Sequence, residues 1–249
     1  MSSSVDLAVV YRIANAPVRP FPFPHLYVRD VFPDDVYAQL RAQLPAPGTM
    51  APIEQARGVR GYPDRFVMLL GRALPGALSA PQRDFWDAFA RSILSGRIAR
   101  AVLEKFEPYV EERLRALPDF EILDEAMLVH DRTNYALGPH TDSPAKVASL
   151  LFYLPADGRM TQYGTSIYVP RDPQFTCPGG PHYDFAAFEL VATMPFEPNS
   201  LFAFPKTSSC FHGVEPIREE GVARDMLLYD LRLRILQAGQ TPAGIAITP

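Results

Sequence analysis

The sequence predicts an α+β fold, with helices in the first half of the chain and a barrel or sandwich of short strands in the second. Apolar residues recur at helical spacing from about residue 80 to residue 117. Beyond residue 119 the chain changes to short apolar segments separated by turn residues, which is the pattern of antiparallel strands. The 26 prolines also favour strand ends and ordered loops over long helices. Helices followed by a run of strands are typical of α+β folds.

The N-terminal half contains shorter elements before the long helical block. Residues 20–24, PFPFP, form an extended lead-in, and residues 25–32 alternate well enough to form a strand. Residues 33–44 predict a helix, because a proline suits a first helical turn and the two aspartates after it suit the positive end of the helix dipole. Residues 48–66 show no clear period and are predicted to be a loop.

The second half contains six predicted strands joined by turns. Two of the connections, 156–164 and 170–187, are long for hairpin loops. Because long loops on a rigid barrel often carry substrate recognition, we expect specificity to be determined there. The predicted strands are 121–135, 145–154, 165–169, 188–193, 200–204 and 224–233.

Length and composition indicate one soluble domain of 249 residues. We expect about 1–118 to be a helical support region, about 119–235 to be the catalytic core and 236–249 to be a C-terminal tail. A net charge of −4 gives no basic surface that would favour nucleic acid or an anionic membrane. The sequence shows neither a signal peptide nor an apolar run of membrane-spanning length. The two cysteines, Cys177 and Cys210, suit free thiols in a reducing compartment, so a cytoplasmic location is expected.

Four polar residues of the second half form a candidate site: His140, Asp142, His212 and Arg224. In an extended segment residues i and i+2 point to the same face, so His140 and Asp142 can act together. His212 can supply a third ligand from a distant strand. Two histidines and one carboxylate make the facial triad of non-heme Fe(II) oxygenases, which leaves coordination positions open. Arg224 offers a fixed positive fork for a dicarboxylic co-substrate.

A histidine and an aspartate two residues apart also occur as a turn histidine beside a solvated aspartate. Three features favour the metal site. The turn 137–139 precedes His140, His212 follows an apolar strand and a polar turn, and Arg224 opens the next apolar strand twelve residues after His212. Arg218 is the rival for the carboxylate role, but it lies in a charged turn rather than at the start of a strand.

The chain resembles the Fe(II)- and 2-oxoglutarate-dependent oxygenases, and within them the prolyl-hydroxylase-like branch, in four stretches: GPHTDSPAKVASLLFYLP, GTSIYVP, FEPNSLFAFPKTSSCFHGVEPI and ARDMLLYDLRL. The resemblance covers roughly 121–233, and the segment PFPHLYVRDVFPDDVYAQL is also similar to the beginning of that branch. It implies a double-stranded β-helix, or jelly roll, with helices from the N-terminal half packed on it.

The resemblance implies roles for individual residues. His140, Asp142 and His212 would be the iron ligands, and Arg224 would bind the distal carboxylate of 2-oxoglutarate. Tyr153 matches a position where a tyrosine hydroxyl often shares that carboxylate.

Two neighbours of the turn before His140 are further candidates. Tyr135 is expected to face the co-substrate, with Asn134 beside it as a second candidate. Many relatives carry a small hydroxyl residue two positions after the arginine, but this chain has Met226 there. Arg224 is therefore expected to act with Tyr153 alone.

The implied activity is that of an iron-dependent dioxygenase. It would hydroxylate an unactivated C–H bond of a small molecule, or of a carrier- or peptide-linked metabolite, while O2 and 2-oxoglutarate yield succinate and CO2. Asp142 favours hydroxylation over halogenation, because related halogenases carry a small residue there and halide fills the vacancy.

Several alternatives stay open. A prolyl-type hydroxylase of a protein side chain would use the same site. A cupin-like metal enzyme without 2-oxoglutarate would not need Arg224, and a non-catalytic binding module would not need the intact triad. Lys146 and Arg132 can reach an anionic substrate, although most such charges are solvated. His182 lies in a loop rich in proline and glycine and is more often a surface residue, although that loop can cover the site.

Overall fold

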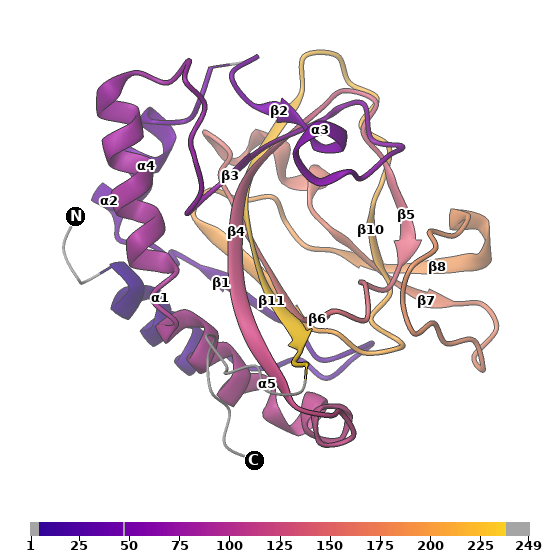
Figure 1. Cartoon of the computed structure of the whole chain (residues 1–249). Coiled ribbons are helices and arrows are strands. Elements are labelled where there is room, and N and C mark those ends of the chain that lie inside the picture. Colours follow the sequence, from indigo (N-terminus) through magenta and orange to yellow (C-terminus); the bar gives the residue numbers. More distant parts are fainter. Residues whose placement is uncertain (1–4, 47, 238–249) are drawn as a thin grey trace.

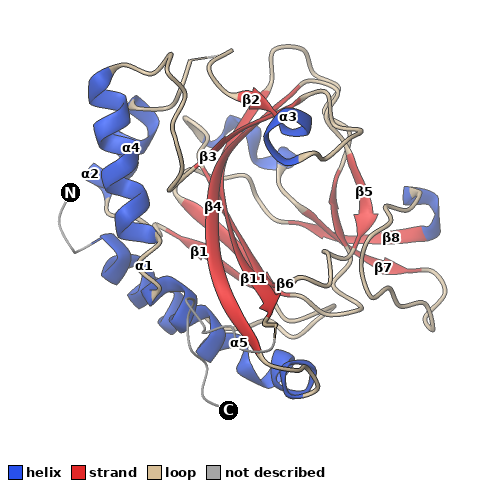
Figure 2. Ribbon diagram, in the orientation of Figure 1, coloured by secondary structure: helices blue, strands red, loops and turns tan. Residues whose placement is uncertain are grey.

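The computed structural model describes residues 5–46 and 48–237. Two antiparallel sheets, of seven and four strands, lie face to face as the halves of a jelly roll, and helices cover the outer face of the larger sheet (Figures 1 and 2). Among the described residues, none of the helices combines the length and the hydrophobicity needed to span a bilayer. The predicted α+β class with a jelly-roll core is confirmed.

The large sheet has the strand order β1-β9-β6-β11-β4-β3-β2. Its two longest strands, β4 and β11, pair along their whole length, from Ala223 opposite Arg132 to Ile235 opposite Phe120. The strands are β1 (Leu26–Arg29), β2 (Ala51–Pro52), β3 (Arg65–Leu69), β4 (Phe120–Arg132), β6 (Lys146–Tyr153), β9 (Ser200–Pro205) and β11 (Ala223–Ile235).

The small sheet has the order β5-β10-β7-β8. Its register places His212 of β10 directly opposite His140 of β5 and Ile167 of β7. This pairing brings together two segments about seventy residues apart in the sequence. The strands are β5 (Leu137–His140), β7 (Ser166–Pro170), β8 (Phe188–Thr193) and β10 (His212–Val214).

Side chains of the large sheet alternate between two cores, as the period of a strand requires. On β6, Leu150 and Phe152 pack toward the helices, whereas Leu151 and Tyr153 face the small sheet. On β11, the helix-facing core includes Leu227, Tyr229 and Leu231. Met226 and Leu228 face the space between the sheets. Residues 224, 226, 228 and 230 therefore share one face of β11, and this face is turned toward the space between the two sheets.

Helices α1, α2, α4 and α5 cover the outer face of the large sheet, and α5 packs against α1 (Figure 2). Trp86 of α4 is fully buried there, and its indole N–H donates to the carbonyl of Gln43. Burial of an aromatic side chain of this kind stabilises the fold by about 1.5–3 kcal/mol. The α-helices are α1 (Val5–Asn15), α2 (Asp34–Ala42), α3 (Ile53–Arg57), α4 (Ala80–Ile93) and α5 (Arg97–Arg115), and two 3-10 turns are η1 (Gly158–Tyr163) and η2 (Phe185–Ala187).

The structure confirms the helical block 80–117 as two helices, which are separated because Gly96 adopts a left-handed conformation, with φ of 76°, where α5 begins. The predicted loop over 48–66 is wrong, since it contains β2, α3 and the start of β3. The helix α1 was not predicted at all.

The first 118 residues are not only helical support, because β1, β2 and β3 join the large sheet. The predicted tail, 236–249, lies outside the described residues except for its first two positions.

Candidate metal centre

The two histidines of the candidate site are fixed by the register of the small sheet. The ring centroids of His140 and His212 are 4.3 Å apart. The Nδ1 atom of His140 lies 3.0 Å from the carbonyl of Gly138, and Nδ1 of His212 lies 2.9 Å from the carbonyl of Cys210. Each Nδ1 therefore carries the proton and donates it, which leaves both Nε2 atoms as acceptors that can bind a metal ion.

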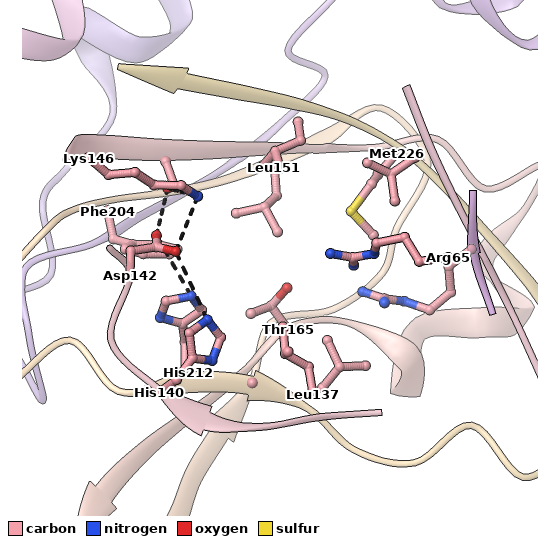
Figure 3. A pocket seen from close by; sticks show the side chains of 16 residues that line it. Arg65, Leu137, His140, Asp142, Lys146, Leu151, Thr165, Phe204, His212 and Met226 are labelled. Atoms are coloured by element: carbon pink, nitrogen blue, oxygen red, sulfur yellow. Dashed lines mark hydrogen bonds and ion pairs between the residues drawn. The ribbon is translucent and has the colours of Figure 1, made fainter. Parts of the chain in front are cut away.

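Asp142 completes the triad from the turn that follows β5. Its carboxylate oxygens lie 4.0 Å from Nε2 of His140 and 3.9 Å from Nε2 of His212. One ligand atom from each residue lies within 4.8 Å of the other two, and all three side chains are buried. The sequence predicted that His140 and Asp142 share a strand face. The strand instead ends at His140, and the turn brings Asp142 back toward the imidazoles (Figure 3).

Lys146 and Ser149, both on β6, hold the carboxylate of Asp142 in place. The Lys146 ammonium lies 3.1 Å from Oδ1, and the Ser149 hydroxyl donates to Oδ2 over 2.8 Å. Lys146 also pairs with the buried Asp230 of β11 over 3.0 Å. Lys146 thus contacts a triad residue directly, rather than standing free in the cavity as a charge for a substrate.

The charge states of the triad suit a divalent cation. Burial lowers the pKa of both His140 and His212, so the imidazoles are neutral near pH 7. Burial opposes ionisation of Asp142, but the Lys146 ammonium and the hydrogen bond from Ser149 bring its pKa well below the usual range. Two neutral nitrogens and one carboxylate oxygen are a donor set for a first-row transition metal.

A cavity of about 100 Å³ opens beside the triad, between the two sheets. Its walls combine polar and apolar side chains, and the apolar ones include Val129, Leu151 and Leu228 from the large sheet and Val214 from the small sheet. The triad lies at one end, and Arg65 of β3 points in from the opposite side (Figure 3).

Arg224 lines the cavity beside Arg65 and is fully buried. Its Nη1 donates to Asp131 over 2.9 Å, but Nε and Nη2 have no hydrogen-bond partner among the described residues. Burial lowers the pKa of Arg224, and Asp131 opposes the shift. An arginine keeps its proton in proteins, so this group is a buried cation with an unpaired edge. Arg218, its rival, is exposed.

The three remaining predicted residues differ in position. Tyr153 and Tyr135 are buried close to Arg224, although neither lines the cavity. The Tyr153 hydroxyl accepts a hydrogen bond of 3.0 Å from the backbone N–H of Thr165, whereas the Tyr135 hydroxyl lacks a partner within the described ranges. Asn134 is exposed in a turn with φ of 77° and lies away from the cavity.

The structure adds residues that the sequence analysis did not assign. Thr165 lines the cavity with a buried hydroxyl that is unpaired in the part of the chain described. Its side chain direction depends on the pairing of β7, for which the sequence offered no signal. Arg65 lay inside the segment predicted as a loop.

The long loop 170–187, which carries His182, covers the triad. The His182 ring lies 4.4 Å from the His140 ring, between centroids, and its Nδ1 hydrogen-bonds to the Tyr62 hydroxyl. The loop packs closely, because a Cβ on Gly138 would lie 2.5 Å from the carbonyl oxygen of Tyr183. One of the two long loops expected to carry specificity therefore forms a wall beside the metal centre.

Comparison with known proteins places the fold. No protein-family model and no curated protein matches the sequence. The structure aligns with the non-heme α-ketoglutarate-dependent carbocyclase SnoK of nogalamycin biosynthesis, with a TM-score of 0.52 and 10% identity, over 97% of this chain and 93% of that one. The chain has the fold of the non-heme, 2-oxoglutarate-dependent enzymes.

Two further structures align less closely. A prolyl hydroxylase from Trichoplax adhaerens, in complex with a hypoxia-inducible-factor peptide, gives a TM-score of 0.49 and 12% identity, over 91% of this chain and 88% of that one. An oxidoreductase of the 2OG-Fe(II) oxygenase family from Burkholderia pseudomallei gives 0.45 and 15%, over 84% of each chain.

Proposed function

We propose that the protein is an Fe(II)- and 2-oxoglutarate-dependent dioxygenase. The observation that carries this proposal is a single cavity with two different ends. A buried triad of two neutral imidazoles and one carboxylate lies at one end, and a buried arginine with an unpaired edge lies at the other. A metal site alone would not need the arginine, and a carboxylate site alone would not need the triad.

The triad fits Fe(II). His140, Asp142 and His212 would bind the metal on one face and leave the cavity side open for co-substrate and O2. Their supports are already in place: the carbonyls of Gly138 and Cys210 fix the imidazole tautomers. Such outer contacts orient metal ligands and contribute to metal affinity.

The other end of the cavity fits the distal carboxylate of 2-oxoglutarate. The unpaired Nε and Nη2 of Arg224 form one edge of the guanidinium, which matches two carboxylate oxygens in a bidentate pair. The unpaired hydroxyl of Thr165 lines the same cavity and can donate to the same group. Buried N–H and O–H groups cost about 1–3 kcal/mol each when they have no acceptor, so an anionic acceptor is expected there.

When bound, iron and 2-oxoglutarate supply the oxidising chemistry, in which O2 is consumed, succinate and CO2 are formed, and a C–H bond of the substrate is oxidised. The chain itself supplies position and exclusion. Lys146 and Ser149 hold Asp142, and apolar walls that include Leu151 and Phe204 keep water from the reacting groups. Asp142 occupies the position that halide would need, which supports hydroxylation of a small molecule, or of a carrier- or peptide-linked metabolite.

Arg224 also separates this proposal from the cupin-like alternative. An enzyme without a dicarboxylic co-substrate would leave the Nε and Nη2 donors of Arg224 buried and unpaired in its working state. The experiment is 2-oxoglutarate turnover by purified protein, followed as succinate. We expect succinate only when Fe(II), O2 and 2-oxoglutarate are all present, and none from the His140→Ala variant. Succinate formation by His140→Ala at the wild-type rate would contradict the proposal.

A further inference from the structure

Asp131 is shared by two arginines that lie in one row across the large sheet. In the β3–β4 pairing Arg65 is directly opposite Asp131, and in the β4–β11 pairing Arg224 is directly opposite the same residue. The three residues therefore occupy adjacent positions on three neighbouring strands. Opposite charges placed directly across strands attract, so this row is held by register as well as by its own contacts.

The hydrogen bonds of this row leave one guanidinium edge free. Arg65 uses Nε and Nη2 for both oxygens of Asp131, over 2.7 and 2.9 Å. Arg224 gives Asp131 only Nη1, over 2.9 Å. The corresponding Nε and Nη2 edge of Arg224 has no partner in the described part of the chain, and Arg224 lines the cavity. Asp131 thus binds Arg224 through Nη1 only. The Nε and Nη2 edge, which suits a carboxylate, is left free within the described residues.

The guanidinium group of Arg65 contacts an aromatic ring through its flat face, in addition to the bidentate pair that its edge forms with Asp131. Its guanidinium carbon lies 4.3 Å from the centroid of the Tyr135 ring, and its side chain is 14% exposed. A guanidinium that stacks on an aromatic ring and forms a bidentate pair has little freedom to rotate. Lysine could not reproduce both contacts.

The charges of the row sum to the value that one carboxylate requires. Asp131 is fully buried and cancels one of the two positive charges, so the row has a net charge of +1. Without Arg65, Asp131 would neutralise Arg224, and the cavity end would no longer attract an anion. Without Asp131, two guanidinium groups would face each other in a buried site with no carboxylate between them.

We infer that Arg65 and Asp131 are positioning residues for the distal carboxylate of the co-substrate, and that Arg65 supplies the charge that keeps Arg224 electrostatically available. This inference rests on the proposed function. It gives β3, which lies outside the stretch that resembles the oxygenase core, a role in co-substrate binding. It also gives the site a second cation in a chain that carries Met226 where many relatives have a hydroxyl.

The alternative is that the Arg65–Asp131 pair only fastens β3 to β4. The chain contains a matched control for that alternative. Arg57 forms a bidentate pair with Glu125 of β4, over 3.0 and 2.7 Å, and it comes from the same N-terminal region. Arg57 does not line the cavity beside the triad. If fastening were the whole function, the two pairs would behave alike.

The test compares two 2-oxo acids on Ni(II)-loaded protein by isothermal titration calorimetry. 2-Oxoglutarate and 2-oxopentanoate share the end that chelates the metal, but 2-oxopentanoate has a methyl group in place of the distal carboxylate. The ratio of their dissociation constants therefore reports the distal carboxylate alone. We expect Arg65→Gln to reduce the preference for 2-oxoglutarate about tenfold, with 2-oxopentanoate binding unchanged. Arg57→Gln should keep the wild-type preference.

An unchanged preference in folded Arg65→Gln would overturn the inference, and so would an equal loss of affinity for both acids. If the glutamine variant does not fold, Arg65→Lys takes its place. Because lysine keeps the charge and loses the bidentate pair, it should lose several-fold in preference, and an unchanged preference would overturn the positioning role of Arg65. A wild-type protein that does not prefer 2-oxoglutarate would instead refute the proposed function, and the inference with it.

Discussion

His212 lies directly opposite His140 in the antiparallel pairing of β10 with β5, with the ring centroids 4.3 Å apart. Backbone hydrogen bonds of the small sheet therefore set the spacing of the two imidazoles, independently of any metal. Asp142 depends instead on a turn, and Lys146 and Ser149 hold its carboxylate. The site is preorganised by two different means, which respond differently to substitution.

The ligand assignment predicts loss of metal binding when one triad residue is removed. His140→Ala and Asp142→Ala should each retain the fold and lose at least about tenfold in Ni(II) affinity, because three ligands act on one ion. Metal content after dialysis, measured by atomic emission, gives the result. His130→Ala is the control, since His130 pairs with Asp225 outside the triad. Retention of metal by both triad variants would contradict the assignment.

Lys146 is predicted to stabilise the metal-free protein more than the metal-loaded protein. In Lys146→Met, Asp142 and Asp230 would be left buried without their shared cation, and the free energy of unfolding should fall by about 3–5 kcal/mol. A divalent ion supplies positive charge to Asp142, so Ni(II) should recover part of this loss. Urea denaturation with and without Ni(II) measures both values, and an equal loss in the two states would argue against the role.

Thr165 is predicted to donate its unpaired hydroxyl to the co-substrate. Thr165→Val keeps the shape of the side chain and removes the donor, so the KM for 2-oxoglutarate should rise about tenfold with little change in kcat. Thr165→Ser should restore most of the affinity, because the serine hydroxyl can occupy the same position. Steady-state kinetics on the three proteins decides the matter. A fall in kcat without a change in KM would place the hydroxyl elsewhere in the reaction.

His25 is predicted to contribute to acid sensitivity. Burial lowers the pKa of His25 in the folded protein, while the unfolded chain binds the proton near the ordinary value of about 6.5. As the pH falls below that value, the unfolded state takes up a proton that the folded state excludes, so stability is lost. His25→Gln should therefore show a flatter decline between pH 7 and pH 5. Urea midpoints at the two pH values test this, and an unchanged slope would count against it.

The fold class and the candidate ligands followed from local patterns in the sequence. The spacing of His140 and Asp142, and the position of Arg224 at the start of an apolar strand, are properties of short segments. Arg65 was missed because its significance depends on the register of β3 with β4, which no local pattern in 48–66 revealed. The contact of Lys146 with Asp142 was missed for a similar reason, since it depends on the turn after β5.

The most direct test of the whole account is anaerobic titration of the Fe(II)-loaded protein with 2-oxoglutarate, followed by visible absorption. The account predicts a weak charge-transfer band in the wild type. Arg224→Met should need about a hundredfold more 2-oxoglutarate to produce the band, whereas Arg218→Met should match the wild type. No band from folded, iron-loaded wild-type protein would contradict the use of 2-oxoglutarate and favour a cupin-like metal enzyme.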